Sequence, residues 1–181
     1  MKKTIIVWFT GISGSGKTTI ANYLKSELIS KDYSVRILDA DDIRNTVHKK
    51  LGFTKEDITK NNLYLAELAI KYSKKYNFIL IPVISPFRDV RKKVRETIGN
   101  MFREIYIKCS LEECMKRDTK GLYKKALSKE LGNLIGFPGS SVPYEEPENP
   151  DLVLYTDNES IEECTKKLYN YLIETIEKLN H

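Results

Sequence analysis

Residues 10–19 read TGISGSGKTT and directly follow the apolar run IIVWF. The glycines and the lysine match the spacing G-x-x-x-x-G-K-[ST], which is typical of a loop that binds nucleotide phosphates. Glycine allows a backbone that turns successive N–H groups inward at the positive end of the following helix. Lys17 is predicted to contact the β and γ phosphates, and the Thr18 hydroxyl to bind Mg²⁺. The residues predicted to hold the nucleotide in this loop are Gly11, Ser13, Gly14, Ser15, Gly16, Lys17, Thr18 and Thr19.

Carboxylates follow the second predicted strand, where the chain reads LDADDIR with Asp39, Asp41 and Asp42. Open α/β sheets bind their ligands at the carboxyl edge, so these side chains are expected near the phosphate loop. Carboxylates at this edge can hold Mg²⁺ or accept a proton from an attacking hydroxyl. Asp41 is also suited to capping the next helix, and the sequence leaves both interpretations open.

The third predicted strand ends in ISPFR, which brings Ser85 and Arg88 to the same edge of the sheet. Arg88 is placed to bind a phosphate, although an arginine that begins a helix is often only solvated. An Asn-Lys-x-Asp run, which common GTPases use to read guanine, is absent from the sequence. The chain is also short for a motor protein, and these features together favour a kinase.

Short apolar runs that alternate with amphipathic stretches must position these residues. The apolar runs are nearly continuous, as in strands buried on both faces of a parallel sheet. Strands are predicted over residues 4–10, 33–39, 77–85, 104–109 and 151–156. Helices are predicted over residues 17–30, 41–51, 55–75, 89–100, 111–117 and 161–179, two of them opening with the capping boxes Ser110 to Glu113 and Ser160 to Glu163. The predicted fold is a three-layer α/β/α sandwich with a mostly parallel central sheet.

Residues 119–150 interrupt this alternation, because they are rich in Gly, Pro, Ser and Lys and show no strand pattern. A stretch of this length inside a compact domain is usually a functional lid or a disordered linker. Its basic residues and aromatics favour a mobile lid within a single domain that spans residues 1–181.

Composition narrows the class of partner. The formal net charge is +5, a modest excess that suits an anionic small molecule, and no basic aromatic platform for nucleic acid stands out. The three cysteines, Cys109, Cys114 and Cys164, have neither disulfide nor zinc-site spacing and are expected to be reduced and structural. No apolar run is long enough to cross a bilayer, so a cytoplasmic protein without membrane contact is expected.

Several segments together resemble the adenylylsulfate kinase family, in this order and spacing. They are GISGSGKTTIA, LDADDIR, LGF, VISPFR, RDTKGLYKKA and GFPGSSVPYEEPENPDL. The resemblance implies a P-loop kinase fold and transfer of a phosphoryl group from ATP, with Mg²⁺, to the 3'-hydroxyl of adenosine 5'-phosphosulfate. It also implies a homodimer, for which the apolar face of residues 55–75 is either an interface or core.

The resemblance also implies roles for individual residues. Asp41 would be the base, with Lys17, Asp39 and Ser85 at the reacting end. Asp39 would also lie beside the Mg²⁺ that Thr18 binds, and Arg117 would flank the adenine of ATP. Residues implied to bind the acceptor are Arg44, Phe53, Asn61, Arg88, Lys120 and Phe137. Ser85 matches a serine that the family is described as carrying in phosphorylated form.

The segment after LGF departs from the family pattern D-R-x-x-N-I-R-R. Ile58 stands where the first arginine is expected, and Leu63 and Tyr64 replace the later pair. The loss of a charge-assisted contact could lower acceptor affinity by about one to two decades. Two alternatives therefore stay open: a related kinase with another acceptor, such as a cytidine diphosphate derivative used in surface-polysaccharide synthesis, and a nucleotide-binding regulatory module without turnover.

Overall fold

The computed structural model describes residues 3–47, 51–118, 121, 123–124 and 142–178. Five strands form one sheet in the order β2-β3-β1-β4-β5, and every neighbouring pair is parallel. The strands are β1 (Ile5–Thr10), β2 (Val35–Ile37), β3 (Phe78–Pro82), β4 (Phe102–Lys108) and β5 (Leu152–Tyr155). The predicted parallel sheet is confirmed.

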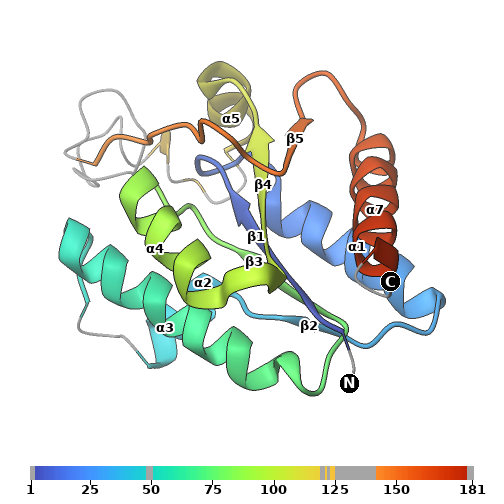
Figure 1. The fold of residues 1–181 in the computed structure, drawn as a ribbon. Coiled ribbons are helices and arrows are strands. Elements are labelled where there is room, and N and C mark those ends of the chain that lie inside the picture. The colour runs from blue at the N-terminus through green and yellow to red at the C-terminus, as the bar shows by residue number, and fades with distance from the viewer. Residues whose placement is uncertain (1–2, 48–50, 119–120, 122, 125–141, 179–181) are drawn as a thin grey trace.

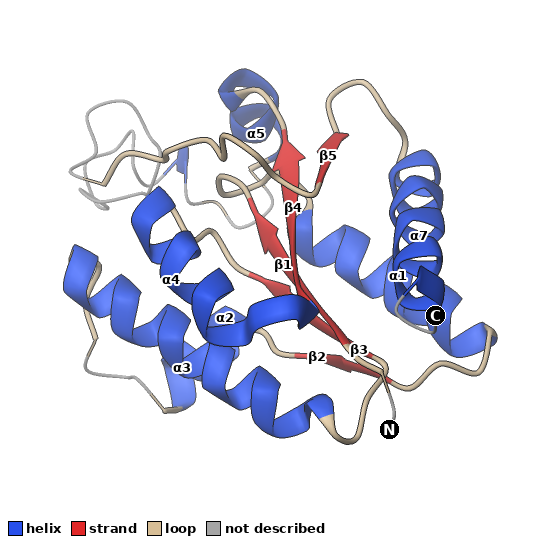
Figure 2. Ribbon diagram, viewed as in Figure 1, coloured by secondary structure: helices blue, strands red, loops and turns tan. Residues whose placement is uncertain are grey.

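Helices cover both faces of this sheet (Figure 1). One face is covered by α1 (Lys17–Ser30) and α7 (Ile161–Lys178), which also pack against each other. The other face is covered by α2 (Ala40–Thr46), α3 (Lys55–Ser73) and α4 (Arg88–Ile98). A 3-10 turn, η1 (Gly99–Met101), directly precedes β4, and the short helix α5 (Leu111–Arg117) follows β4. Figure 2 shows the strands enclosed between the two helical layers, which is the predicted three-layer sandwich.

The central strand shows why a continuous apolar run predicts this fold. Every residue of β1 is buried. Ile5, Val7 and Phe9 pack toward α1 and α7, whereas Ile6 and Trp8 pack toward α3 and α4. Successive side chains of a strand point to opposite faces, so a strand between two layers of helices needs apolar residues at both parities.

Some element bounds differ from the prediction. The helix predicted over residues 41–51 is α2 and ends at Thr46, and the Arg44 guanidinium donates to the carbonyls of Leu51 and Gly52 after the helix has ended. The edge strand β2 is shorter than predicted because it pairs only with β3. β4 begins at Phe102, two residues earlier than predicted, because Phe102 already pairs with Ile6 of β1.

The two predicted capping boxes have different outcomes. At the start of α7, the Glu163 backbone N–H donates to Ser160 Oγ at 3.2 Å and the Ser160 N–H donates to Glu163 Oε2 at 2.8 Å, so the box is complete. At α5 only half of the box forms, because the Ser110 N–H donates to Asp157 and Glu113 pairs with Arg117. The α5 cap is thus shared with the chain that follows β5.

The cysteines behave as predicted. Cys109, Cys114 and Cys164 are all buried and free. Burial, reinforced by the neighbouring Cys109, raises the pKa of Cys114 to about 12, which keeps this thiol protonated at neutral pH. No helix in the described part of the chain is long and apolar enough to cross a membrane.

Residues 142–151, the return segment, end the predicted lid and lie against the sheet. The Tyr144 hydroxyl is 2.9 Å from Thr10 Oγ1 at the end of β1, and the Glu145 N–H donates to the Pro86 carbonyl at 2.8 Å. The buried Arg91 of α4 donates to the Glu145 carbonyl at 2.7 Å and pairs with Glu104 of β4. This part of the predicted lid is therefore anchored, whereas residues 125–141 lie outside the described residues.

Candidate active site

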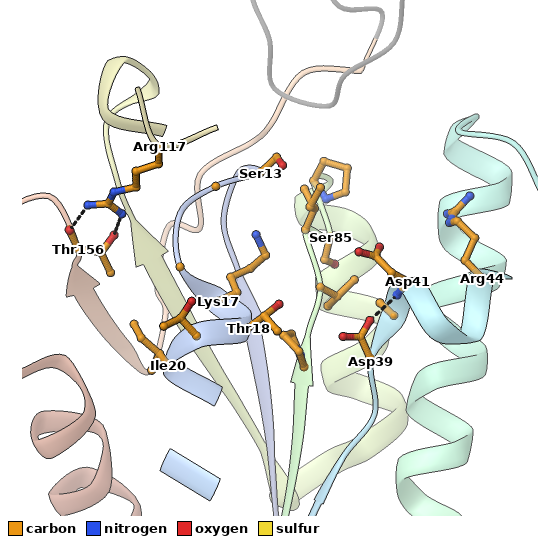
Figure 3. A pocket seen from close by; sticks show the side chains of 18 of the residues that line it. Ser13, Lys17, Thr18, Ile20, Asp39, Asp41, Arg44, Ser85, Arg117 and Thr156 are labelled. Carbon is orange, nitrogen blue, oxygen red and sulfur yellow. Dashed lines mark hydrogen bonds between the residues drawn. The ribbon is translucent and has the colours of Figure 1, made fainter. Parts of the chain in front are cut away.

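Most of the predicted functional residues meet at the carboxyl edge of the sheet, in one cavity of about 760 Å³. Three loops open into it: the loop after β1, the start of α2 after β2, and the turn after β3 (Figure 3). Among the residues that line it are Ser13, Gly14, Gly16, Lys17, Thr18, Thr19, Asp39, Asp41, Arg44, Phe53, Asn61, Ser85 and Arg117. Parallel strands bring their carboxyl ends to one edge, which is why residues far apart in sequence share a cavity.

The phosphate loop has the backbone that its glycines predict. Gly11, Gly14 and Gly16 all have positive φ, and α1 begins directly after Gly16. The Lys17 ammonium donates to the carbonyls of Gly11 at 2.9 Å and Ile12 at 2.8 Å, so it lies across the loop. Ser15 of this loop is buried, and its carbonyl accepts a hydrogen bond from the Thr156 hydroxyl at 2.8 Å. The chain after β5 therefore also holds the loop.

Gly11 has no room for a side chain, and alanine at this position is expected to disrupt the loop. An added Cβ would lie 2.5 Å from the Ile107 carbonyl oxygen and 2.8 Å from Ser15 Oγ, at a φ of +152°. We expect Gly11→Ala to lower the free energy of unfolding by about 2–4 kcal/mol, measured by urea denaturation. Gly99→Ala is the control, because Gly99 also has positive φ (+70°) but open space around its Cβ position. Equal losses in the two variants would show that backbone strain alone matters.

The two carboxylates after β2 are placed differently. Asp39 is the N-cap of α2, since its Oδ1 accepts from the N–H groups of Asp41 at 2.8 Å and Asp42 at 3.3 Å. The alternative that Asp41 caps this helix is therefore wrong. Asp41 is exposed and lines the cavity, as does Thr18 of α1 (Figure 3). Mg²⁺ usually takes one or two carboxylates together with substrate phosphates, so Thr18 and Asp39 are suited to hold it.

Ser85 is held in a strained conformation at the turn after β3. Its φ is +46°, which is uncommon for a residue with a side chain, and only 1% of its surface is exposed. The Arg91 guanidinium donates to its carbonyl at 2.7 Å, and the Asn62 amide donates to its hydroxyl at 2.7 Å. Such conformations persist only where neighbouring contacts enforce them, and they cluster at functional sites.

Arg117 lies at the other end of the cavity from Asp41 (Figure 3). Two hydrogen bonds hold its guanidinium in place: Nε donates to Glu113 Oε1 at 3.0 Å, and Nη2 donates to the Thr156 carbonyl. The chain after β5 and the first residues of α7 add lining residues that sequence reasoning missed, namely Thr156, Glu159, Ser160, Ile161 and Glu162. The capping box at Ser160 indicates only the start of a helix, so the position of these residues after a parallel strand is the one signal that could have suggested them.

Arg44 and Phe53 are brought together beside Asp41. The Arg44 guanidinium carbon lies 4.6 Å from the centre of the Phe53 ring, and 48% of Phe53 is exposed. Burial is the main cause that lowers the pKa of Arg44 from its ordinary value, against the opposing effect of Asp41 and Asp57. The aromatic ring and the guanidinium thus present a flat, charged wall at the mouth of the cavity.

One predicted acceptor residue, Arg88, is not at the cavity, and two others are not among the described residues. Arg88 is not among the residues that line it; instead Nε donates to the Glu146 carbonyl at 2.7 Å and Nη1 pairs with Glu148 at 3.0 Å. Lys120 and Phe137 lie outside the described residues. Of the lining residues on α3, Ile58, which had been noted as a departure, and Asn62 were not predicted to bind.

Comparison with known proteins shows which family this chain resembles. Residues 3–155 match the model of the family described as adenylylsulphate kinase. The adenylyl-sulfate kinase of Bacillus licheniformis is 43% identical over 171 residues, which are 94% of this chain and 85% of that protein. That of Halothermothrix orenii is 45% identical over 176 residues, which are 96% of this chain and 91% of that protein.

A solved structure has the same fold. The Mycobacterium tuberculosis APS kinase CysC, in complex with AMPPNP and APS, has a TM-score of 0.85 and 35% identity to this chain, with 95% of this chain and 99% of that one covered. The match includes the three-layer sandwich that bears the cavity. On these sequence and structural grounds, the chain belongs to the adenylylsulphate kinase family.

Proposed function

We propose that this chain is an adenylyl-sulfate kinase, which transfers the γ-phosphoryl group of ATP to the 3'-hydroxyl of adenosine 5'-phosphosulfate (APS). The observation that carries the proposal is that the phosphate loop and the carboxylates of Asp39 and Asp41 line one cavity. A solved relative with this fold is described as a complex with AMPPNP and APS, an ATP analogue and the acceptor. One cavity that holds donor and acceptor together is what direct phosphoryl transfer requires.

The donor side of the proposal rests on the phosphate loop. The backbone N–H groups between Gly11 and Thr19 would bind the phosphates at the start of α1, and Lys17 would exchange its carbonyl partners for β and γ oxygens. Thr18 and Asp39 would hold Mg²⁺, which supplies charge neutralisation on the phosphates when bound. Arg117, fixed by Glu113 and Thr156, would lie against the adenine.

The acceptor side rests on the wall formed by α2 and α3. Asp41 would take the proton of the attacking hydroxyl, because it is exposed to the cavity and does not cap its helix. Phe53 offers a ring for stacking on the acceptor base, and Arg44 offers positive charge beside it. Asn61 is 3% exposed and lines the same wall. Arg88, Lys120 and Phe137 remain predictions for this side.

Ile58, which stands where the family pattern has an arginine, is buried and well packed at this wall. It is 3% exposed and packs in a small cluster with Phe87, Val90 and Val142. The cluster joins α3 and α4 to the return segment, so the isoleucine contributes to packing where an arginine would contribute charge. This substitution motivates the test of a second class of acceptor.

The test is an ADP-release assay of the purified protein with ATP and APS, beside a panel of cytidine and uridine diphosphate derivatives. We expect acceptor-dependent turnover with APS and none in an Asp41→Ala blank. Turnover with a panel member but not with APS would assign the chain to another acceptor within its family. ADP release without dependence on any acceptor, or no release at all, would support a regulatory nucleotide-binding module.

We propose, further, that the chain acts as a homodimer in the cytoplasm. The apolar face of α3 gives this proposal no support, because Leu65 is fully buried and Leu63, Leu68 and Ile70 pack against the same core cluster. Sedimentation velocity of the purified protein tests the oligomeric state directly. A single monomer-sized boundary at micromolar concentration would reject the dimer.

A further inference from the structure

Asn62 of α3 touches the proposed catalytic centre at one atom. Its Nδ2 donates to Ser85 Oγ at 2.7 Å, and the two side chains come from segments that are 23 residues apart in the chain. Each residue has only 1% of its surface exposed, yet both line the cavity. The contact is therefore a buried polar pair at the floor of the cavity, not a surface hydrogen bond.

The backbone of Ser85 is fixed independently of this contact. Arg91 Nη1 donates to its carbonyl at 2.7 Å, and Thr10 Oγ1 approaches the same oxygen at 3.4 Å. The next residue, Pro86, accepts a hydrogen bond from the return segment at 2.8 Å. With the backbone held in this way, the side-chain rotation of Ser85 and the direction of its O–H bond are what Asn62 determines.

Hydrogen-bond chemistry gives this contact a direction. An amide nitrogen only donates, so Ser85 Oγ accepts from Asn62 and its single proton must point elsewhere. Within the part of the chain that the structure describes, Ser85 Oγ has no acceptor for that proton. Lys17 and Asp41 line the same cavity as Ser85 (Figure 3).

We infer that Asn62 is a positioning residue that turns the Ser85 hydroxyl proton toward an oxygen of the phosphoryl group in transfer. The inference rests on the proposed function, since it needs a phosphorylated ligand in the cavity. A preoriented donor aimed at developing charge stabilises the transition state more than the ground state. Asn62 would therefore affect kcat more than the KM of either substrate.

A double-mutant cycle separates this role from simple packing. The proteins are wild type, Asn62→Leu, Ser85→Ala and Asn62→Leu/Ser85→Ala, all assayed with ATP and APS. Leucine keeps the volume of asparagine approximately and removes the donor. We expect Asn62→Leu to lower kcat by about tenfold with each KM within about twofold, and to have no further effect once Ser85 is alanine.

Asn170→Leu is the matched control, because Asn170 is an exposed asparagine on α7, a helix on the opposite face of the sheet from α3. Urea denaturation of every variant identifies any that fails to fold. An equal loss of kcat from Asn62→Leu in the wild-type and Ser85→Ala backgrounds would overturn the inference, since the effect would then not pass through the hydroxyl. An unchanged kcat in Asn62→Leu would overturn it as well.

Failure of the proposed function has a different signature. If wild type turns over another acceptor but not APS, the cycle is run with that acceptor and retains its meaning. If wild type turns over none, the proposed function fails, and the same four proteins are titrated by calorimetry with ADP and aluminium fluoride, which together mimic the phosphoryl group in transfer. A loss of affinity for this mimic in Asn62→Leu that vanishes in the Ser85→Ala background would support the contact, and an equal loss in both backgrounds, or no loss, would overturn it.

Discussion

Asp41→Asn is expected to lower kcat about a thousandfold while leaving the stability of the protein unchanged. The loss is that of a general base, which contributes about 10²–10⁴ to the rate. Asparagine has the same shape as aspartate but does not accept the proton of the attacking hydroxyl. The start of α2 should be unaffected, because its cap is the Asp39 side chain, which accepts from the Asp41 backbone N–H. Initial-rate kinetics at saturating ATP and APS measure the effect.

Asp42→Asn is a closely matched control for this prediction. Asp42 is the next residue of the same helix, is exposed, and also donates its N–H to Asp39, but it is not among the residues that line the cavity. The Asp42 variant is expected to keep wild-type kcat. A kcat above one tenth of wild type in Asp41→Asn would exclude Asp41 as the base, and a similar loss in both variants would indicate a general effect of charge near α2.

Arg91→Met is expected to lower the free energy of unfolding by about 3–5 kcal/mol, the cost of breaking a buried ion pair by removing one partner. Arg91 is 3% exposed, and its Nε lies 2.6 Å from Glu104 Oε1. The same guanidinium donates to the carbonyls of Ser85 and Glu145, each at 2.7 Å. Methionine fills much of the volume but leaves a buried carboxylate with weaker compensation from Arg95, whose Nη2 is 3.5 Å away.

Urea denaturation monitored by the fluorescence of the single tryptophan, Trp8, measures this loss, since Trp8 is fully buried in β1. Lys167→Met is the control, because the Lys167–Glu159 pair has the same N···O distance of 2.6 Å but an exposed lysine. Exposed pairs contribute little, so this control should match wild type within error. Equal midpoints for both variants would contradict the assigned role of Arg91.

Sequence patterns predicted the fold well where the physical cause is local. The run IIVWF is buried on both faces as a central strand, and the glycines of TGISGSGKTT adopt the positive φ that the phosphate loop needs. Both features depend on residue type and short spacing, which the sequence displays directly. The α7 capping box formed for the same reason, because its two partners are three residues apart.

Prediction was weaker where more than one polar group is available for the same hydrogen bond. The sequence left open whether Asp41 caps the next helix or acts as a base, and the structure gives the cap to Asp39, the residue directly before α2. The half-formed box at α5 has a related cause, since Asp157 from the chain after β5 takes the Ser110 N–H. These outcomes depend on which groups the fold brings within hydrogen-bond distance.

The sequence by itself determined the α/β class, the phosphate loop, and the residue types at the ends of the first three strands. Only the tertiary structure decided which arginine serves which purpose: Arg88 pairs at the surface with Glu148, whereas Arg91 is buried against Glu104. Only the tertiary structure brought Asn62 to the Ser85 hydroxyl and the chain after β5 to the cavity. The reason is physical: a local pattern sets backbone conformation, but burial and hydrogen-bond partners arise from packing between segments distant in the chain.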